Sequence, residues 1–277
     1  MKKDSALEAA RMLEELWASI RPEKIWQGRT GRGVRVAIVD SGIDAAHPDL
    51  AGRVEDSVEA YRDARGRIAF RKSLTGDEAG HGTACAGIIK GIAPEVSLYS
   101  IKVLGPNASG SGEMFLAGLD YAIARRMQII NLSLGTTKPE LSLPLHDLLD
   151  RAYHAGSIVV AAANNLPQPS FPSIFSSSLV SVSKQASPDP FDFTFRFGEV
   201  IELLAPGVQV RTTWPGGGYR QLTGNSFACP HVAGVIALLM EAYPNLTPFQ
   251  VKTILYAIAK QNQAKTDNDA AAKPEGG

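Results

Sequence analysis

The sequence is poor in cysteine, carries no excess of charge of either sign and has no long hydrophobic run. Cysteine accounts for 2 of the 277 residues, which argues against a fold held together by disulfides. Basic and acidic residues number 28 each, so the net charge does not indicate nucleic acid or an anionic membrane as a partner. No run approaches the roughly 18 apolar residues of a membrane span. What remains is a chain long enough for one large α/β domain with a substantial core.

The N-terminus also lacks the apolar segment that follows the basic start of a signal peptide. We therefore expect a cytoplasmic protein, with secretion as the alternative if a leader precedes the sequence given. Residues 1–20 instead predict an amphipathic helix, because apolar side chains recur at helical spacing among Ala, Glu and Leu. We interpret this helix first as a packing element and second as an inhibitory or partner-docking segment. Its apolar positions are Leu7, Leu13, Leu16, Trp17 and Ile20.

Apolar strands alternate with helices between residues 21 and 260. This alternation predicts a single α/β domain with three α/β/α layers, in which helices cover both faces of a mostly parallel central sheet. Residues 51–79 are polar and predict a surface hairpin or an irregular loop, and residues 261–277 predict a disordered tail. The expected strands are 34–39, 96–103, 128–134, 157–163, 179–183 and 200–204, and the expected helices include 81–90, 114–126, 143–155 and 247–259.

Residues 224–234 read Gly-Asn-Ser-Phe-Ala-Cys-Pro-His-Val-Ala-Gly and lead into an apolar run that ends at residue 240. Pro230 suits the first turn of a helix, and the run is apolar almost all round, which is typical of a helix buried in a core. Ser226 therefore lies just ahead of this helix or in its first turn. There the free backbone N–H groups favour negative charge on a bound substrate oxygen. On this stretch alone, Ser226 is equally well explained as a helix cap.

Two further stretches favour a chemical role for Ser226. Residues 34–40 predict a buried strand that ends on Asp40 and a glycine turn. In residues 80–87, Gly-His-Gly-Thr-Ala-Cys-Ala-Gly, His81 opens an apolar helix. The order Asp, His, Ser along the chain is one of three known for a nucleophilic triad. With these three motifs the chain resembles the subtilisin-like serine proteases, the subtilase family, from about residue 20 to residue 259.

The resemblance implies a role for each motif residue. Ser226 would be the nucleophile, His81 the general base and Asp40 the group that orients the imidazole. A serine hydroxyl is a weak nucleophile near neutral pH, and an imidazole with a pKa near ~6.5 can take its proton. Asn165 matches the asparagine whose side-chain amide donates to the oxyanion in this family. The family usually has glycine before it, where this chain has Asn164, and asparagine tolerates unusual backbone angles better than most residues.

The resemblance also implies that the partner is a peptide or protein substrate bound in an extended conformation between two exposed segments. The path from Asn165 to Phe171 is shorter than in broad-specificity relatives, which predicts an altered specificity pocket. The expected substrate-binding residues are Ser109, Gly110, Gly112, Ser133, Leu134, Gly135 and Ala163.

Many subtilases bind calcium tightly in an insertion that follows the helix of the catalytic histidine. Here residues 91–94, Gly-Ile-Ala-Pro, leave no room for that insertion, although Asp49 resembles one of the ligands. We expect no cofactor and no metal in the active site, loss of the tight calcium site, and at most weak calcium binding.

The motif around Ser226 departs from the family at three positions. Relatives most often have Thr-Ser-Met where this chain has Asn-Ser-Phe, at residues 225–227, and Cys229 stands where they have serine or threonine. Cys229 is interpreted as a buried filler or as a redox-sensitive thiol, and a disulfide with Cys85 is conceivable. We expect a serine endopeptidase that performs general turnover or matures a dedicated precursor peptide. The alternative is a catalytically silent binding protein with the same fold, and the oligomeric state is left open.

Overall fold

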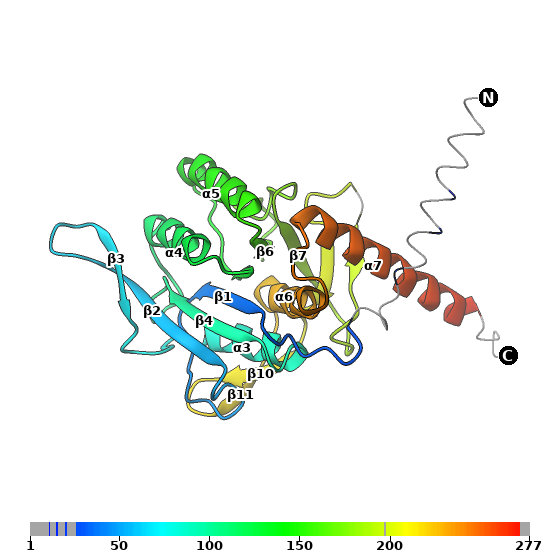
Figure 1. Ribbon diagram of the computed structural model, residues 1–277, viewed down its shortest axis with the longest axis horizontal. Coiled ribbons are helices and arrows are strands. Elements are labelled where there is room, and N and C mark those ends of the chain that lie inside the picture. Colours follow the sequence, from blue (N-terminus) through cyan, green and yellow to red (C-terminus); the bar gives the residue numbers. More distant parts are fainter. Residues whose placement is uncertain (1–10, 12–14, 16–19, 21–25, 197, 272–277) are drawn as a thin grey trace.

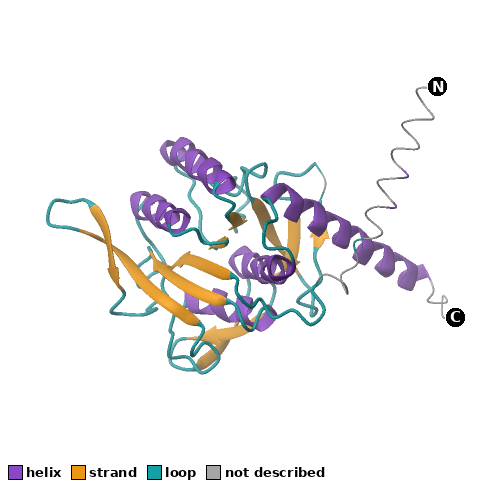
Figure 2. Ribbon diagram, viewed as in Figure 1, coloured by secondary structure: helices purple, strands orange, loops and turns teal. Residues whose placement is uncertain are grey.

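The computed structural model describes residues 11, 15, 20, 26–196 and 198–271. Its centre is a nine-stranded sheet, part of which is labelled in Figure 1 and coloured orange in Figure 2. The strand order is β3-β2-β4-β1-β5-β6-β7-β9-β8. Neighbouring strands from β2 to β9 are parallel, and only the pairs that add β3 and β8 at the two edges are antiparallel. The strands are β1 (Arg35–Asp40), β2 (Val54–Arg62), β3 (Ile68–Lys72), β4 (Ser97–Lys102), β5 (Ile129–Leu132), β6 (Ile158–Ala162), β7 (Val180–Gln185), β8 (Thr194–Phe195) and β9 (Leu203–Pro206).

Helices pack on both faces of this sheet, and each face has its own hydrophobic core. The side chains of β1 alternate between the two cores: Val36 and Ile38 point to one, Ala37 and Val39 to the other. The first core is shared with α3, α6 and α7 and the second with α4 and α5, on the opposite side in Figure 1. The three-layer α/β/α architecture predicted from the sequence is confirmed. The helices are α3 (His81–Ile92), α4 (Gly112–Ala124), α5 (Ser142–His154), α6 (Asn225–Ala242) and α7 (Pro248–Ala271), with a short 3₁₀ helix at Pro139–Leu141.

Two segments outside the predicted apolar strands form pairs of antiparallel strands. Residues 51–79 contain a hairpin of β2 and β3, which is the first of the two predicted alternatives. Strand β2 also pairs with β4 and so extends the central sheet. Residues 215–217 are the turn of a separate two-stranded sheet, β10 (Val210–Trp214) with β11 (Gly218–Leu222). The strand predicted at 200–204 lies at β9, three residues later. Strands β2, β3, β10 and β11 are rich in polar residues, so the apolar pattern alone did not reveal them.

Helix α6 is the core helix predicted from the apolar run. It begins at Asn225, so Ser226 lies in its first turn, and Pro230 lies inside the helix rather than at its start. By length and composition α6 could cross a membrane, but 83% of its most apolar window is buried inside the protein. Its apolar surface is therefore accounted for by contacts with the sheet and with α3.

Helix α7 runs to Ala271 and so continues into the segment for which the sequence predicted disorder from residue 261. That part of the prediction is corrected. The physical reason is that residues 261–271 contain neither proline nor glycine, so no strong helix breaker lies in them. The predicted helix over residues 1–20 lies outside the described residues except at isolated positions.

Candidate active site

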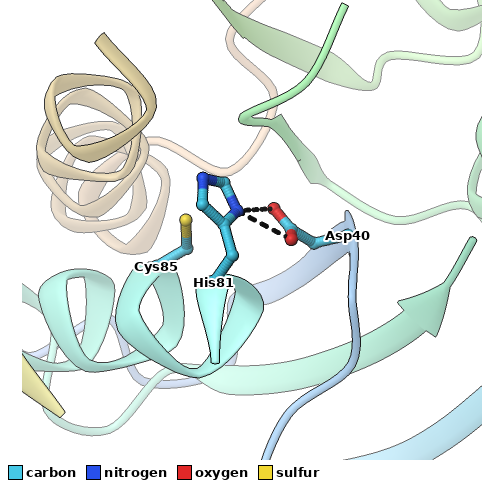
Figure 3. A group of neighbouring side chains, drawn as sticks. All are labelled: Asp40, His81 and Cys85. Atoms are coloured by element: carbon cyan, nitrogen blue, oxygen red, sulfur yellow. Dashed lines mark hydrogen bonds and ion pairs between the residues drawn. The ribbon is translucent and has the colours of Figure 1, made fainter. Parts of the chain in front are cut away.

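Asp40 and His81 form a hydrogen-bonded pair at the carboxyl edge of the sheet. Asp40 is the last residue of β1 and is fully buried, and His81 is the first residue of α3. The imidazole Nδ1 lies 2.8 Å and 2.9 Å from the two carboxylate oxygens of Asp40 (Figure 3). Asp40 therefore holds Nδ1, which leaves Nε2 as the nitrogen that can accept a proton from another group.

Ser226 lies on the same hollow as His81. This hollow has a volume of about 410 Å³, and both residues line it. In the structure the Ser226 hydroxyl donates to the backbone oxygen of Ser133 at 3.1 Å, so the serine and the imidazole share the hollow without a hydrogen bond between them. The Ser133 hydroxyl in turn donates to the Ser226 carbonyl at 2.8 Å. That carbonyl needs an outside donor, because Pro230, four residues on, has no N–H.

A second buried carboxylate, Asp77, holds the Asp40 turn against the start of α3. It accepts hydrogen bonds from the Ser41 hydroxyl and the Gly80 N–H on one oxygen, and from the N–H and hydroxyl of Thr83 on the other, at 2.6–2.8 Å. Ser41 also accepts from the N–H of Gly82 at 3.0 Å. Asp77 was not among the residues predicted from the sequence to form the site. The one sequence feature that points to it is its position four residues before His81.

The pKa of His81 is raised above its usual 6.5 by a balance of opposing effects. Burial, the largest effect, disfavours the charged imidazolium and lowers the pKa. The charge and hydrogen bond of Asp40, together with the more distant charge of Asp77, favour it and outweigh burial. The site therefore stabilises the protonated form of His81, which is the form a general base passes through.

Asn165 lies across the helix start from Ser226. Its side-chain oxygen accepts the backbone N–H of Asn225 at 2.9 Å, and both Asn165 and Ser226 line a second hollow of about 440 Å³. Because the oxygen faces Asn225, the NH₂ group of the same amide is directed away from that bond and is available as a donor. The Ser226 N–H, in the first turn of α6, is a second candidate donor, since first-turn N–H groups have no partner within the helix.

The seven residues expected to bind substrate surround these two hollows. The smaller hollow lies between the 109–112 segment and the 133–135 segment, and the larger one between 133–135 and the 162–165 segment. A side chain at Gly110 would meet the Val103 oxygen at 2.5 Å, and one at Gly135 would meet the Phe171 oxygen at 2.9 Å. These glycines therefore allow close backbone packing at the walls of the hollows. Ser109, Gly110 and Gly112 line the smaller hollow, Ala163 lines the larger, and Ser133, Leu134 and Gly135 line both.

The two cysteines are buried free thiols, and the structure contains no disulfide between them. Burial, the main cause, raises the pKa of both Cys85 and Cys229, so both stay protonated and unreactive. The Cys229 sulfur lies 3.3 Å from the Val160 oxygen, where it acts as a small filler.

Cys85 lies beside the Asp40–His81 pair (Figure 3), and possible ligand atoms of the three residues lie within 4.8 Å of one another. Nδ1 of His81 is engaged with both carboxylate oxygens of Asp40, so the group is arranged as a hydrogen-bonded pair rather than as a set of free metal ligands.

Comparisons with known proteins agree on one family. A model of the subtilase family matches residues 31–272. The chain is 36% identical to subtilisin NAT from Bacillus subtilis subsp. natto over 251 residues, which are 84% of this chain and 62% of that protein. It is 35% identical to subtilisin DY from Bacillus licheniformis, covering 87% of this chain and 89% of that protein. The crystal structure of a cold adapted subtilisin-like serine proteinase superposes with a TM-score of 0.69 at 30% identity, covering 83% of each chain.

The opposing effects on His81 predict how its titration responds to mutation. In the wild type we expect the imidazole to titrate above 6.5. In Asp40→Asn the charge that raises the pKa is gone while burial remains, so we expect titration below 6.5. Both values can be read from imidazole NMR signals, assigned with a His81→Gln variant. His231, whose pKa burial lowers, is the internal control and should not respond to Asp40→Asn. A His81 value that stays above 6.5 in Asp40→Asn would contradict this account.

Proposed function

The chain belongs to the subtilase family, and from that premise we propose that it is a serine endopeptidase that cleaves peptide bonds through an acyl-enzyme on Ser226. The observation that carries the proposal is the Asp40–His81 pair, whose histidine lines the same hollow as Ser226. The chain spans 62% of the length of subtilisin NAT, so the activity rests on this site rather than on a match to the whole of that protein.

The first step is attack of the Ser226 oxygen on the substrate carbonyl carbon. The hydroxyl turns from the Ser133 oxygen toward Nε2 of His81, which takes its proton as the C–O bond forms. Such hydrogen bonds are often made only when substrate is bound. Asp40 stabilises the imidazolium that results and keeps the ring in place through Nδ1.

The second step is collapse of the tetrahedral intermediate. The negative oxygen is stabilised by two donors, the Asn165 NH₂ group and the Ser226 N–H, with the positive end of the α6 dipole behind them. His81 returns its proton to the leaving amine as the C–N bond breaks, and the acyl group remains on Ser226. Water, activated by the same imidazole, then attacks the ester and releases the second product.

The substrate is proposed to bind as an extended strand between the 109–112 and 133–135 segments. The backbone N–H and C=O groups of Gly110 and Gly135 form no hydrogen bond with any described residue. Exposed, unpaired backbone groups on two facing segments are what an added peptide strand requires. Physiologically, either general turnover or maturation of a dedicated precursor peptide fits this mode of binding.

The decisive test compares wild type with Ser226→Ala, using a fluorophosphonate probe and a randomised peptide library. We expect the probe to label wild type only. We also expect library cleavage to fall by more than about 10³-fold in the variant, because no other nucleophile replaces the serine. A folded wild type that neither reacts with the probe nor cuts any peptide would support the alternative, a binding protein that has kept the fold.

A tight calcium site of the kind found in relatives is proposed to be absent, because the residues present do not fit it. Calcium takes six to eight oxygen ligands. The carboxylate of Asp49 instead accepts a hydrogen bond from the Tyr219 phenol at 2.8 Å, and α3 ends at Ile92 with only a short turn before β4. Asp44 likewise accepts from the Gly216 N–H at 2.8 Å. These carboxylates tie the 44–49 loop to the β10–β11 hairpin.

This arrangement predicts that stability does not depend on calcium. A chelator should change the melting temperature by less than about 2 °C, since a ligand that is not bound gives no stabilisation. Tyr219→Phe should lower the melting temperature in the presence or absence of calcium, because it removes the donor to Asp49. Both are measured by differential scanning fluorimetry, with Tyr243→Phe, another exposed tyrosine, as the matched control. A large drop in melting temperature caused by the chelator alone would contradict the absence of a tight site.

Charge around the two hollows supports a preference for acidic substrates. Lys138 lines both hollows, and no aspartate or glutamate lines either one. Its ammonium group forms no ion pair with any described residue, and the nearby exposed Glu140 lines neither hollow. A single cation on a surface without carboxylates attracts negative charge.

We therefore expect peptides with glutamate ahead of the cleaved bond to have a kcat/KM about two- to five-fold higher than their glutamine counterparts, as for an exposed charge pair. Lys138→Glu should reverse this order in favour of lysine-containing peptides. Lys72→Glu, on the remote edge strand β3, is the matched control and should leave the order unchanged. If the Lys138 and Lys72 variants behave alike, the preference does not arise at Lys138.

A further inference from the structure

Asn225, the residue before the proposed nucleophile, is buried, and its backbone N–H and both polar groups of its side chain make hydrogen bonds. It is 3% exposed and begins α6. Its backbone N–H donates to the Asn165 side-chain oxygen at 2.9 Å. Its side-chain NH₂ donates to the backbone oxygens of Ala163 at 3.2 Å and Asn164 at 2.8 Å. Its side-chain oxygen accepts from the Lys184 N–H at 2.9 Å and the Ser183 hydroxyl at 3.1 Å.

These bonds connect three segments that the sequence keeps far apart. The 163–165 loop follows β6, Lys184 belongs to β7, and Asn225 begins α6. Strand β7 is fixed to the same loop through the bond from the Ala163 N–H to the Val182 oxygen at 2.8 Å. The side chain of Asn225 therefore fixes the loop that carries Asn165 relative to both the sheet and the helix of Ser226.

The backbone N–H of Asn225 also decides which way the Asn165 amide faces. An N–H group can only donate, so it requires the oxygen of the amide and not its NH₂ group. The NH₂ group is then directed toward the hollow that Ser226 lines. Asn225 thus acts on the Asn165 NH₂ group in two ways. Its backbone N–H sets the orientation of the amide, and its side chain sets the position of the loop that carries it.

We propose that Asn225 is a positioning residue that holds the Asn165 amide as the oxyanion donor. The proposal rests on the function proposed above. The threonine that relatives most often have here offers a single hydroxyl, which cannot donate to two carbonyls and accept from two donors at once. This chain therefore supports its oxyanion donor with a set of contacts that a threonine could not reproduce.

The test combines kinetics with structure. Asn225→Asp keeps the shape of the side chain but turns its two donors into an acceptor that faces the carbonyls of Ala163 and Asn164, so the loop should move. We expect kcat to fall about 10- to 100-fold, with KM within about threefold of wild type, as for a misplaced catalytic group. Asn225→Thr should lose less, because its neutral hydroxyl places no negative charge against these carbonyls, while both variants keep the backbone donor to Asn165. Ser181→Ala, which removes buried hydrogen bonds elsewhere on β7, is the control and should keep wild-type kcat.

Two further measurements separate positioning from general damage. In an Asn165→Ala background, Asn225→Asp should cost less than about threefold in kcat, because the donor that it positions is already gone. A full loss in that background would overturn the proposal. Crystal structures of wild type and Asn225→Asp decide independently of turnover: a shifted or turned Asn165 side chain supports the proposal, and an unmoved one overturns it. If wild type hydrolyses no peptide, the proposed function fails, while the comparison of structures still decides whether Asn225 positions Asn165.

Discussion

The site depends on the close approach of three backbone segments around Asp40. A side chain at Gly82 would meet the Gly42 oxygen at 2.1 Å, and one at Gly42 would meet the Gly76 oxygen at 2.2 Å. Gly42 also has a φ of 115°, a conformation that other residues rarely adopt. The buried carboxylate of Asp77 closes this contact with four hydrogen bonds to Ser41, Gly80 and Thr83. With the backbones this close, the imidazole of His81 has little freedom except to face Asp40.

Ser226 is placed by a different constraint, the burial of helix α6. The helix packs against the sheet and against α3, where a side chain at Gly234 would already meet Ile92 at 2.9 Å. Pro230 leaves the Ser226 carbonyl without an intrahelical donor, and the Ser133 hydroxyl takes that role. The hydroxyl of Ser133, which directly follows β5, therefore supplies the hydrogen bond that the Ser226 carbonyl cannot receive within α6. The packing of the apolar helix α6 against the sheet and α3 thus also places Ser226 at the polar site.

Much of the fold and the centre of the site could be predicted from the sequence, and the rest could not for physical reasons. Buried parallel strands are continuous apolar runs, and the candidate site residues Asp40 and Ser226 lie directly at the ends of apolar segments, so both are visible locally. Asp77 and Asn225 are not, because each joins segments that are distant in the chain: Asp77 connects Ser41 to the start of α3, and Asn225 connects the 163–165 loop to β7. The hairpin at Val210–Leu222 is a similar case, since its pairing and its contacts with the 44–49 loop decide its structure rather than its composition.

The three departures from the family motif around Ser226 are each explained by packing. The Phe227 ring lies 5.5 Å from the His81 ring and packs against Ala84 and Ile88 of α3, so it fills space beside the imidazole. Cys229 faces backbone oxygens of β5 and β6, where a thiol is small enough to fit and, with its raised pKa, stays neutral. Asn225 connects the 163–165 loop to β7. None of them points a new reactive group into the hollows, so the substitutions change what surrounds Asp40, His81 and Ser226 without adding a further candidate for the proposed chemistry.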